Sequence, residues 1–598
     1  IPKFKEIAAP RIHDPRQPVF ILDHDIQNKS EKNLAKYAKI EAFAKEHGID
    51  FYPAGSGIGH QVMMEQGYVT PGSLVVASDS HSNMYGAACC VGTPVVRTDA
   101  AVIWATGTFW WEVPPIVKVV LEGNLPAGST GKDVIVTLCG LYNADEVLNC
   151  AIEFVGDGVA RLSMDERMTI SNMTTEWGAL VGMFPCDGVT MDYIRKRPRI
   201  SPQSAKEIEA LDLTPDKGAY YAKTLRLDLG AVTPHVSGPN EVKVMKSVAE
   251  IEKERVKIQK AYLVSCVNSR TSDIEAAARV LEGKKVAEGV ELYVAAASAG
   301  VESEAQKSGA WATLEKAGAR FLPAGCGPCI GLGMGLLEAG EVGISATNRN
   351  FKGRMGSKDA FAYLASPAVV AASAAAGYIC GPQKVDGRKL EKRIEEHLRA
   401  GSERASVKII EGFPNVVRGE AIFLPKDNMN TDSIYAGQYT YKDDMKPHEM
   451  ASVIFSNYDE NFKNVAHPGD ILVGGSNFGT GSSREQAATA LKFFGIPLLI
   501  AETFSQTYKR NAFNNGFMCM ECPGLVAALR KKFAAQKDPT IRTGWSLEVD
   551  FTQSKVRVAT TGAKFEILPF RETAQCLIVA GGAEAQARRQ LQSALPTS

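Results

Sequence analysis

Cysteines with the spacing of metal ligands are the first feature of this sequence that could do chemistry. Cys326 and Cys329 stand three positions apart in a run rich in glycine and proline, and Cys266 ends a separate apolar, strand-like stretch. A glycine-rich loop has no regular pitch, so both of its thiols can face one point. Three thiols at strand ends suit a [4Fe-4S] cluster that keeps one iron without a protein ligand. A closed zinc site would need a fourth ligand, and none stands nearby in the sequence.

The remaining cysteines give a weaker signal. Cys519 and Cys522 form a second CxxC after a turn-like run, so a metal or redox role stays open for them. With 12 cysteines in 598 residues, the chain is not a disulfide scaffold. The others lie among apolar or small residues and are expected to be buried small hydrophobes. They are Cys89, Cys90, Cys139, Cys150, Cys186, Cys380 and Cys576.

Histidines lie beside aspartates just past apolar runs near the start of the chain. The runs 18–22 and 73–78 read as strands, and in α/β folds catalytic groups favour the loops beyond strand ends. A carboxylate next to an imidazole fixes its tautomer and stabilises its protonated form, which suits acid–base chemistry. These residues are Asp23, His24, His60, Asp79 and His81. Glu176 stands in an apolar setting, so we expect it to be ion-paired or functional.

Two further stretches could bind anions. Arg349 and Arg354, with a glycine between them, could clamp a carboxylate, although a solvated basic loop would look the same. The run 474–481 is rich in glycine and leads to Ser482, Ser483 and Arg484. We expect one of these serines to start a helix, with Glu485 or Gln486 completing a capping box. The helix N-terminus and Arg484 would then hold an anion beside a serine hydroxyl.

Length and composition are those of a multidomain globular enzyme. Apolar residues make up 45% and charged residues 22% of the chain, and Lys+Arg and Asp+Glu both number 67. The balanced charges therefore give no overall electrostatic field that would attract nucleic acid. No apolar run approaches the roughly 20 residues that span a bilayer. The chain begins with Ile1 and shows no targeting segment, which is consistent with the removal of one.

The order of the apolar runs predicts an α/β fold. A βαβ rhythm from Cys266 onward implies a parallel sheet. The segment 386–415 is charged and broken and reads as a linker, with a polar helix over Lys389–Arg399. We expect domains at 1–121, 122–240 and 241–385, and a last domain at 416–598.

Taken together, these motifs resemble the aconitase superfamily along almost the whole chain. The matches are Asp79-Ser80-His81, Ser265–Ser269, Ala324–Gly331, Asn348–Phe351 with Arg354, and Gly481–Glu485. Two further stretches, Leu22–Leu34 and Asn172–Gly178, are similar to the fungal, mitochondrial members that serve lysine biosynthesis. The resemblance implies three α/β domains around an iron–sulfur cluster, plus a mobile C-terminal swivel domain joined by the linker.

The resemblance also implies a role for each matching residue. One [4Fe-4S] cluster would be held by Cys266, Cys326 and Cys329. Ser482 would be the base, Asp23–His24 the acid, and His60–Asp79 and His81–Glu176 further imidazole–carboxylate pairs, with Asp432 at the entry to the last domain. Substrate binding would fall to Ser80, Asn172, Asn268, Asn348, Arg349, Arg354, Lys442, Ser483 and Arg484.

The implied activity is that of a hydro-lyase that interconverts homoaconitate and homoisocitrate. Its partner would be a small tricarboxylate, with no nucleic acid and no membrane, and we expect a mitochondrial monomer. Isopropylmalate and aconitate remain the alternative substrates. A non-catalytic RNA-binding apo form and a structural zinc protein remain alternatives of another class.

Three departures from the superfamily pattern stand out. Members carry a substrate-binding segment upstream of Asp23, which Ile1–Arg16 does not match. Val267 replaces the usual threonine after the first cluster cysteine. An arginine expected soon after Asp432 has no clear match, and we assign its place to Lys442 in a stretch that tunes the substrate's variable arm.

Overall fold

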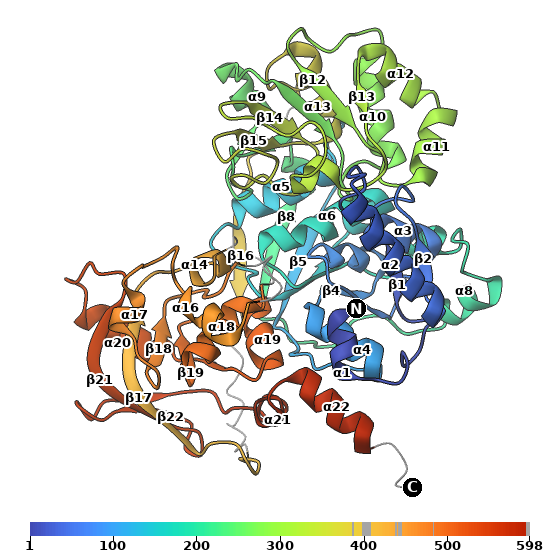
Figure 1. Cartoon of the computed structure of the whole chain (residues 1–598). Coiled ribbons are helices and arrows are strands. Elements are labelled where there is room, and N and C mark those ends of the chain that lie inside the picture. Colours follow the sequence, from blue (N-terminus) through green and yellow to red (C-terminus); the bar gives the residue numbers. More distant parts are fainter. Residues whose placement is uncertain (386–387, 398–407, 437–438, 440–444, 482–483, 594–598) are drawn as a thin grey trace. The chain divides into compact units, whose positions relative to one another are not determined.

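The protein is described here by a computed structural model. It describes residues 1–385, 388–397, 408–436, 439, 445–481 and 484–593. The chain forms two compact units (Figure 1). Unit 1 contains Ile1–Pro15, Val95–Glu112 and Ala400–Ser598, and unit 2 contains Arg16–Pro94 and Val113–Arg399. The domain boundaries expected from the sequence stay predictions.

Unit 2 contains a seven-stranded, mostly parallel sheet. Five of its strands run parallel to one another, and the other two pair antiparallel at one edge of the sheet. In order across the sheet, the strands are β10 (Met245–Ser247), β9 (His235–Ser237), β15 (Phe361–Leu364), β14 (Val342–Ser345), β11 (Lys260–Leu263), β12 (Glu291–Val294) and β13 (Arg320–Phe321). The parallel sheet predicted from the βαβ rhythm is confirmed.

Helices pack their apolar faces on this sheet, so most residues of its central strands are apolar and buried (Figure 1). All four residues of β11 are buried. Ile274 of α10 and Val369 of α13 belong to the same buried cluster as Leu263 of β11. The covering helices are α10 (Thr271–Leu281), α11 (Ala299–Lys307), α12 (Ala310–Ala317) and α13 (Pro367–Ala376).

A five-stranded sheet forms the second core of unit 2. Its order is β16 (Arg393–Glu396), β8 (Lys223–Asp228), β5 (Ile116–Glu122), β6 (Ala151–Val155) and β7 (Val181–Met183). Helices α5 (Gly131–Leu141) and α6 (Met164–Trp177) share its buried cluster. The polar helix predicted over Lys389–Arg399 is wrong, since 393–396 form the edge strand β16, paired antiparallel with β8. Backbone pairing with an open sheet edge outweighed the local helix propensity.

Two short parallel strand pairs complete the strands of unit 2. They are β1 (Val19–Ile21) with β2 (Asp50–Tyr52), and β3 (Leu74–Ala77) with β4 (Val91–Pro94). Helix α2 (Glu31–His47) is capped by Ser30, whose hydroxyl accepts a hydrogen bond from the Asn33 N–H. The other helices are α3 (Gly59–Gln66), α7 (Gly188–Ile194), α8 (Pro202–Glu209) and α9 (Val248–Ile251), with 3₁₀ turns η1 (Ser82–Ala88), η2 (Val159–Arg161), η3 (Leu229–Ala231), η4 (Glu252–Glu254) and η5 (Gly327–Ile330).

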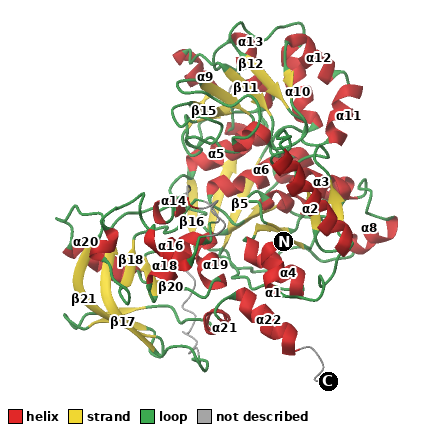
Figure 2. Cartoon of the chain, viewed as in Figure 1, coloured by secondary structure: helices red, strands yellow, loops and turns green. Residues whose placement is uncertain are grey.

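Unit 1 is built on another mixed seven-stranded sheet (Figure 2). Its order is β20 (Met518–Glu521), β19 (Leu498–Ala501), β18 (Ile471–Gly474), β17 (Val416–Leu424), β21 (Ile541–Asp550), β22 (Lys555–Val558) and β23 (Lys564–Glu566). Its helices are α1 (Pro2–Ile7), α4 (Arg97–Thr106), α14 (Thr431–Ile434), α16 (Pro447–Ser452), α17 (Phe462–Val465), α18 (Gln486–Phe494), α19 (Gln506–Asn514), α20 (Pro523–Lys532), α21 (Glu572–Ala580) and α22 (Ala583–Ser593). The predicted α/β class is confirmed in both units.

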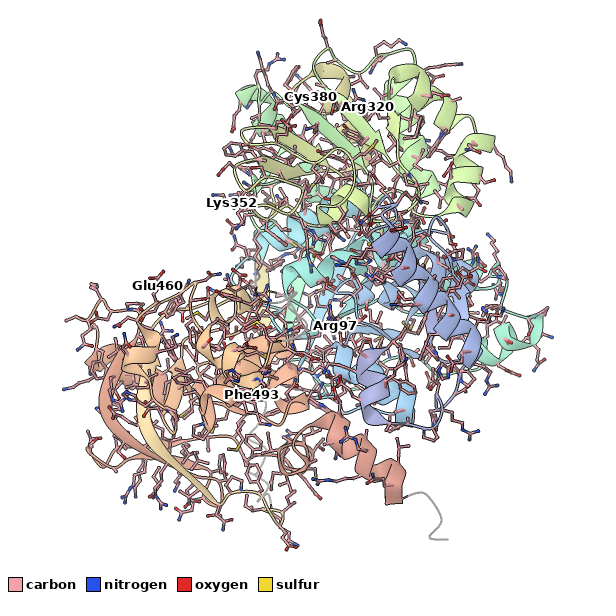
Figure 3. All side chains as sticks on the ribbon, viewed as in Figure 1. Arg97, Arg320, Lys352, Cys380, Glu460 and Phe493 are labelled. Carbon is pink, nitrogen blue, oxygen red and sulfur yellow. The ribbon has the colours of Figure 1, made fainter. Side chains whose placement is uncertain are left out.

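An exposed charge lies at one edge of the seven-stranded sheet of unit 2. Arg320, labelled in Figure 3, stands on the edge strand β13, and its side chain is 57% exposed. An exposed charge on an edge strand opposes pairing with another chain. In the described part of the chain, no helix has the length and apolar character needed to cross a membrane.

Candidate active site and metal centre

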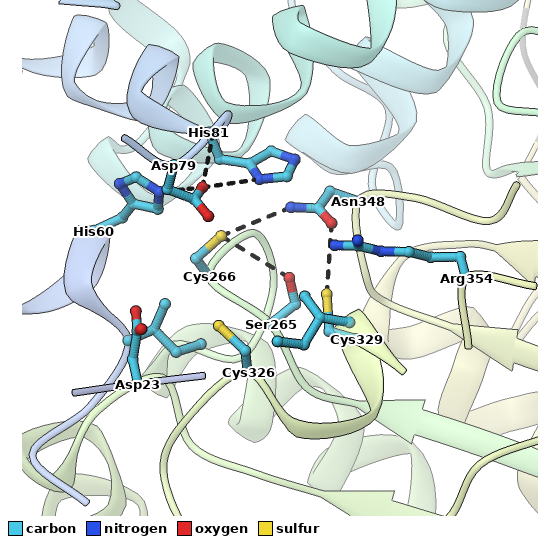
Figure 4. A pocket seen from close by; sticks show the side chains of 12 residues that line it. Asp23, His60, Asp79, His81, Ser265, Cys266, Cys326, Cys329, Asn348 and Arg354 are labelled. Carbon is cyan, nitrogen blue, oxygen red and sulfur yellow. Dashed lines mark hydrogen bonds and ion pairs between the residues drawn. The ribbon is translucent and has the colours of Figure 1, made fainter. Parts of the chain in front are cut away.

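Loops from several strand ends of unit 2 meet at one pocket (Figure 4). Its wall contains all three predicted cluster cysteines, together with members of the predicted imidazole–carboxylate set. The lining residues are Asp23, Ile58, His60, Asp79, His81, Ser265, Cys266, Cys326, Cys329, Ile330, Asn348 and Arg354. Most of them follow the carboxyl ends of β1, β3, β11, β13 and β14, where α/β folds place their ligands.

The loop that carries Cys326 and Cys329 is a tight turn after β13. Cys326 caps the 3₁₀ turn η5, and its N–H donates to the carbonyl of Asp23. Gly325 has no room for a side chain, because a Cβ there would lie 2.5 Å from the Ile26 side chain and 2.9 Å from the Asp23 carbonyl oxygen. The glycine therefore allows the cysteine loop to pack directly on the loop that carries Asp23 and His24.

The spacing of the thiols fits a cluster better than a single ion. Among the described ligand groups, the three sulfur atoms do not form a set within 4.8 Å of one another. Thiolates around one tetrahedral zinc would lie about 3.8 Å apart, given Zn–S bonds of about 2.3 Å. Three thiols that share a pocket at a wider spacing can hold the larger body of an iron–sulfur cluster. Cys266, Cys326 and Cys329 fit such a group.

Two amides point at the sulfur atoms. The Asn172 amide donates to Cys266 Sγ at 3.1 Å, and Asn348 Nδ2 lies 3.7 Å from the same atom. The Cys329 thiol lies 3.5 Å from Asn348 Oδ1. Burial, followed by the nearby Cys329 and Asp79, raises the pKa of the Cys266 thiol to about 12. The thiol therefore stays protonated at neutral pH unless a cation binds it.

Asp79 connects the predicted histidines. Its carboxylate lies 2.8 Å from His60 Nε2 and 3.6 Å from His24 Nε2, and it accepts the backbone N–H of His81 at 2.9 Å. Burial alone would raise the pKa of the Asp79 carboxyl, but the three histidines hold it well below its usual range. Asp79 is thus an anion around which three imidazoles gather.

Asp23 and His24 form a pair beside Cys326. His24 Nδ1 lies 2.5 Å from Asp23 Oδ1, and the other Asp23 oxygen accepts the Gly59 N–H at 2.8 Å. The hydrogen bond with Asp23, and then that with Asp79, raises the pKa of His24 to about 10. Ligand atoms of Asp23, His24 and Cys326 all lie within 4.8 Å of one another. The imidazolium is therefore a proton donor at the edge of the thiol pocket.

Glu176, at the end of α6, joins His81 to Arg349. One carboxylate oxygen lies 2.9 Å from His81 Nε2 and accepts Arg349 Nε at 2.6 Å, while the other is buried without a described partner. Burial alone would raise the pKa of the Glu176 carboxyl, but the charges of His81 and Arg349 outweigh it and lower the pKa. The expectation that Glu176 is ion-paired is confirmed, and its functional role stays a prediction.

The remaining predicted substrate-binding residues of unit 2 divide into two groups. Arg354 lines the pocket, and its buried Nε has no described hydrogen-bond partner. Ser80 lies next to His81, with its hydroxyl 3.5 Å from the ring. Asn268 does not line the pocket, because its amide donates to the Thr169 hydroxyl at 3.2 Å and to Asp273 at 3.0 Å.

Unit 1 contains the other predicted site residues. Arg484 Nη1 donates to Asp432 at 3.1 Å and to the carbonyl of Tyr435, and Asn457 donates to the other Asp432 oxygen at 2.9 Å. Asp432 is thus held between Arg484 and Asn457. Ser482, Ser483 and Lys442 lie outside the described residues.

The predicted capping box in unit 1 is corrected by the structure. Helix α18 begins at Gln486, and the Glu485 carboxylate turns to Lys3 Nζ at 2.9 Å and to the Thr98 hydroxyl at 2.7 Å. An ion pair with a distant segment outcompetes the local backbone N–H groups for this carboxylate.

The second CxxC is buried in the core of unit 1. Cys519 belongs to β20, and the Cys522 thiol lies 3.9 Å from the carbonyl of Glu566. Burial raises the pKa of both thiols. In the part of the chain that the structure describes, neither joins a set of three metal-ligand atoms, so packing accounts for both.

Sequence reasoning missed several residues around the pocket. The Tyr85 hydroxyl lies 2.9 Å from His60 Nδ1, so it holds the ring on the side away from Asp79. Ser265 lines the pocket with a φ of 102°, a conformation that non-glycine residues rarely adopt. Lys132 lies fully buried in the mostly apolar helix α5, next to Asp133, and a lysine at the start of such a run was the available signal. No local pattern distinguishes Tyr85, whereas Ser265 stands in the motif Ser265–Ser269 without a role assigned to it.

Known proteins match this chain over most of its length. The sequence model of the aconitase family (aconitate hydratase) matches residues 5–377, and that of the aconitase C-terminal domain matches residues 393–524. The mitochondrial homoaconitase of Debaryomyces hansenii is 52% identical over 614 residues, covering 99% of this chain and 89% of that protein. The mitochondrial homoaconitase of Mycosarcoma maydis is 53% identical, covering 94% and 83%. That of Candida albicans is 51% identical, covering 99% and 90%.

The three thiols, the His60–Asp79–His81 group and Arg354 line one pocket at the ends of parallel strands, and both family models match in chain order. This chain is therefore a member of the aconitase family.

Proposed function

We propose that the chain is a hydro-lyase that interconverts homoaconitate and homoisocitrate in lysine biosynthesis by the α-aminoadipate route. The observation that carries the proposal is the pocket in which three thiols meet an imidazole–carboxylate pair and Arg354. Glu176 joins His81 of the pocket wall to Arg349. Relatives about half identical over nearly the whole chain are named homoaconitase, which supports the choice of substrate.

An iron–sulfur cluster is the cofactor that family membership implies. We propose one [4Fe-4S] cluster, held by Cys266, Cys326 and Cys329. When bound, it supplies a Lewis acid for the hydroxyl and a carboxylate of the substrate. Asn172 and Asn348 donate toward the Cys266 sulfur and would stabilise its negative charge.

The residues of unit 2 would handle the proton that goes to the leaving hydroxyl. His24 is the acid, because its pairing with Asp23 keeps the ring protonated at neutral pH. Asp79 contacts the rings of His60 and His81 through its carboxylate and holds both in place. Arg349 and Arg354 would bind substrate carboxylates, and the Glu176 contact orients the Arg349 fork.

The residues of unit 1 would handle the carbon-bound proton. Ser482 is the proposed base, with Ser483, Arg484 and Lys442 as carboxylate contacts and Asp432 as the partner of Arg484. Loss of water then needs one base on carbon and one acid on oxygen, and rehydration uses the same groups in reverse. The relatives' names also support a mitochondrial location.

A substrate panel on anaerobically reconstituted protein tests the proposal. The ultraviolet absorbance of the conjugated double bond would be followed with cis-homoaconitate, cis-aconitate and isopropylmaleate. We expect kcat/KM to be at least tenfold higher for cis-homoaconitate than for the other two. A preference for cis-aconitate or isopropylmaleate would retain the proposed mechanism but reject homoaconitate as the substrate. If protein with a full iron content turned over none of the three compounds, the proposed activity would be rejected.

A further inference from the structure

Lys132 is a fully buried cation that none of the proposed catalytic steps uses. It lies in the first turn of α5, and its side chain is 0% exposed. Its ammonium donates to the carbonyl oxygens of Thr347 at 2.5 Å and Ala346 at 3.3 Å. Within the described residues, no carboxylate lies within ion-pair distance of it. Among the described residues, its hydrogen bonds therefore go to main-chain oxygens, while the carboxylates of Glu176, Asp273 and Asp133 act on its charge from a greater distance.

The two carbonyls belong to the segment that enters the pocket. Ala346 and Thr347 follow β14 and directly precede Asn348 and Arg349. Asn348 contacts the sulfur atoms of two predicted cluster cysteines, and Arg349 donates to Glu176 at 2.6 Å. The carbonyls of Ala346 and Thr347 belong to two successive planar peptide units, and the second of these ends at the N–H of Asn348. The ammonium therefore holds the main chain directly before two predicted site residues.

Packing alone does not account for a lysine at this position. Its neighbours on the helix, Val134, Ile135 and Leu138, are all fully buried and apolar. An ammonium in such a place loses its hydration, and burial lowers the pKa of Lys132 to about 8. An apolar side chain of the same length would avoid this cost, but it would leave both carbonyls without a donor.

We propose that Lys132 is a positioning residue for the hydration reaction. By holding the main chain of Ala346 and Thr347, it places Asn348 toward the cluster sulfurs and Arg349 toward Glu176 and a substrate carboxylate. The substrate part of this inference rests on the proposed function, whereas the placement of the segment does not.

Three variants separate positioning from general stability. Lys132→Met keeps the length of the side chain and removes its donors, and Lys132→Gln keeps N–H donors without the charge. Lys260→Met is the control, because Lys260 is also a buried lysine that donates to a main-chain carbonyl, that of Leu336 at 2.9 Å, although it pairs with Glu341 as well, at 2.5 Å. Lys260 lies at the opposite end of β11 from Cys266. Each variant would be compared with the wild type by amide hydrogen exchange over residues 345–352, by iron content, and by KM and kcat.

We expect Lys132→Met to speed exchange over 345–352 at least tenfold and to raise KM at least tenfold, with a smaller fall in kcat. Iron content should stay within twofold of wild type, since the thiols keep their own loops. Lys132→Gln should recover part of both losses. Lys260→Met should leave exchange over 345–352 and KM within twofold.

The inference is overturned if Lys132→Met leaves exchange over 345–352 unchanged, or if Lys260→Met changes it as much. If Lys132→Met does not fold, the same comparison with Lys132→Gln decides, with a threefold change in exchange and KM as the threshold. If wild-type protein hydrates none of the three substrates, the proposed function fails, and the exchange data still decide whether Lys132 holds the segment.

Discussion

Glu176 and Asp79 show how a single carboxylate organises several groups of the candidate site. Asp79 lies within hydrogen-bond reach of His60 and of the His81 N–H, and Glu176 joins His81 to Arg349. His81 thus touches both carboxylates, and the chain of contacts runs from the proposed proton donor to a proposed carboxylate contact. A change in one carboxylate should therefore reach both acid–base chemistry and substrate binding.

Glu176→Gln should lower kcat/KM for cis-homoaconitate by about 10²- to 10⁴-fold. The amide keeps the shape but removes the charge that pairs with His81 and Arg349. Steady-state kinetics of the reconstituted enzyme measure this. Glu153→Gln is the control, because Glu153 lies in β6 and accepts a hydrogen bond from Tyr221, and it should stay within twofold of wild type. A Glu176→Gln enzyme within threefold of wild type would contradict the assigned role.

Asp133, the capping residue of α5, should make stability depend on pH. It accepts N–H groups of Thr130 and His235, yet burial raises the pKa of its carboxyl to about 6 from a usual 3.8. A raised carboxyl pKa means that stability is lost as pH rises from about 4 to about 6, by about 3 kcal/mol.

Asp133→Asn removes this titration, so its stability relative to wild type should increase between pH 4 and pH 7. Denaturant unfolding at both pH values measures the difference. Asp157→Asn, in an exposed loop, provides the matched comparison and should show no such pH trend. If Asp133→Asn changed the free energy of unfolding by the same amount at both pH values, the Asp133 carboxyl would not titrate in this range.

At the scale of elements, the loop between β11 and α10 is held by a buried guanidinium. Arg270 donates to the carbonyls of Cys266 at 2.8 Å and Val267 at 2.6 Å, and to the Thr169 hydroxyl at 2.6 Å. The same loop begins at Ser265, whose φ is 102°. A conformation that is costly for serine persists because several strong hydrogen bonds fix the loop around it.

Arg270→Lys should therefore weaken both the fold and the cluster site. A lysine cannot reproduce the fork that reaches two carbonyls, and we expect a loss of about 3 kcal/mol of stability and less than half the iron per chain. Iron analysis and visible absorbance after reconstitution measure the second effect. Arg279→Lys, at an exposed position of α10, is the control and should match wild type in stability and iron content. Full iron content in Arg270→Lys would show that the loop holds Cys266 without the guanidinium.

At the scale of the whole molecule, unit 1 is assembled from segments far apart in the sequence. Asp99 of α4 is buried, pairs with Arg510 of α19, and accepts the Asn514 amide at 2.7 Å. The Trp110 indole donates to the same Asn514 at 2.7 Å. The segment 95–112 therefore belongs physically to the C-terminal sheet, although some 300 residues separate the two in the chain.

Asp99→Asn should destabilise unit 1 by about 3–5 kcal/mol, because it leaves the Arg510 charge buried without its partner. Calorimetry of the holoprotein measures the shift of the transition. Glu112→Gln removes a partly exposed pair with Lys509, 3.1 Å apart, and should cost about 0–1 kcal/mol. Equal effects of the two substitutions would mean that the Asp99 pair does not hold the segment in place.

Much of the fold and of the candidate site can be predicted from the sequence. Apolar runs located the strands β1, β3 and β11, because strand formation there depends on near neighbours in the sequence. Residue types and motif order also predicted that the three thiols and members of the imidazole–carboxylate set share one site, and they predicted the family. The predicted helix at 389–399 failed because an open edge of the second sheet of unit 2 offered strand pairing.

What the sequence determined by itself is the chemistry available and the order of the elements, since both follow from residue type and local periodicity. Only the tertiary structure decided that Asp79 gathers three histidines, that Asn268 turns away from the pocket, and that Glu485 pairs with Lys3. It also placed the Lys132 ammonium against the carbonyls of Ala346 and Thr347. These contacts join residues up to several hundred positions apart, and their partners depend on strand order and side-chain direction, which no local pattern records.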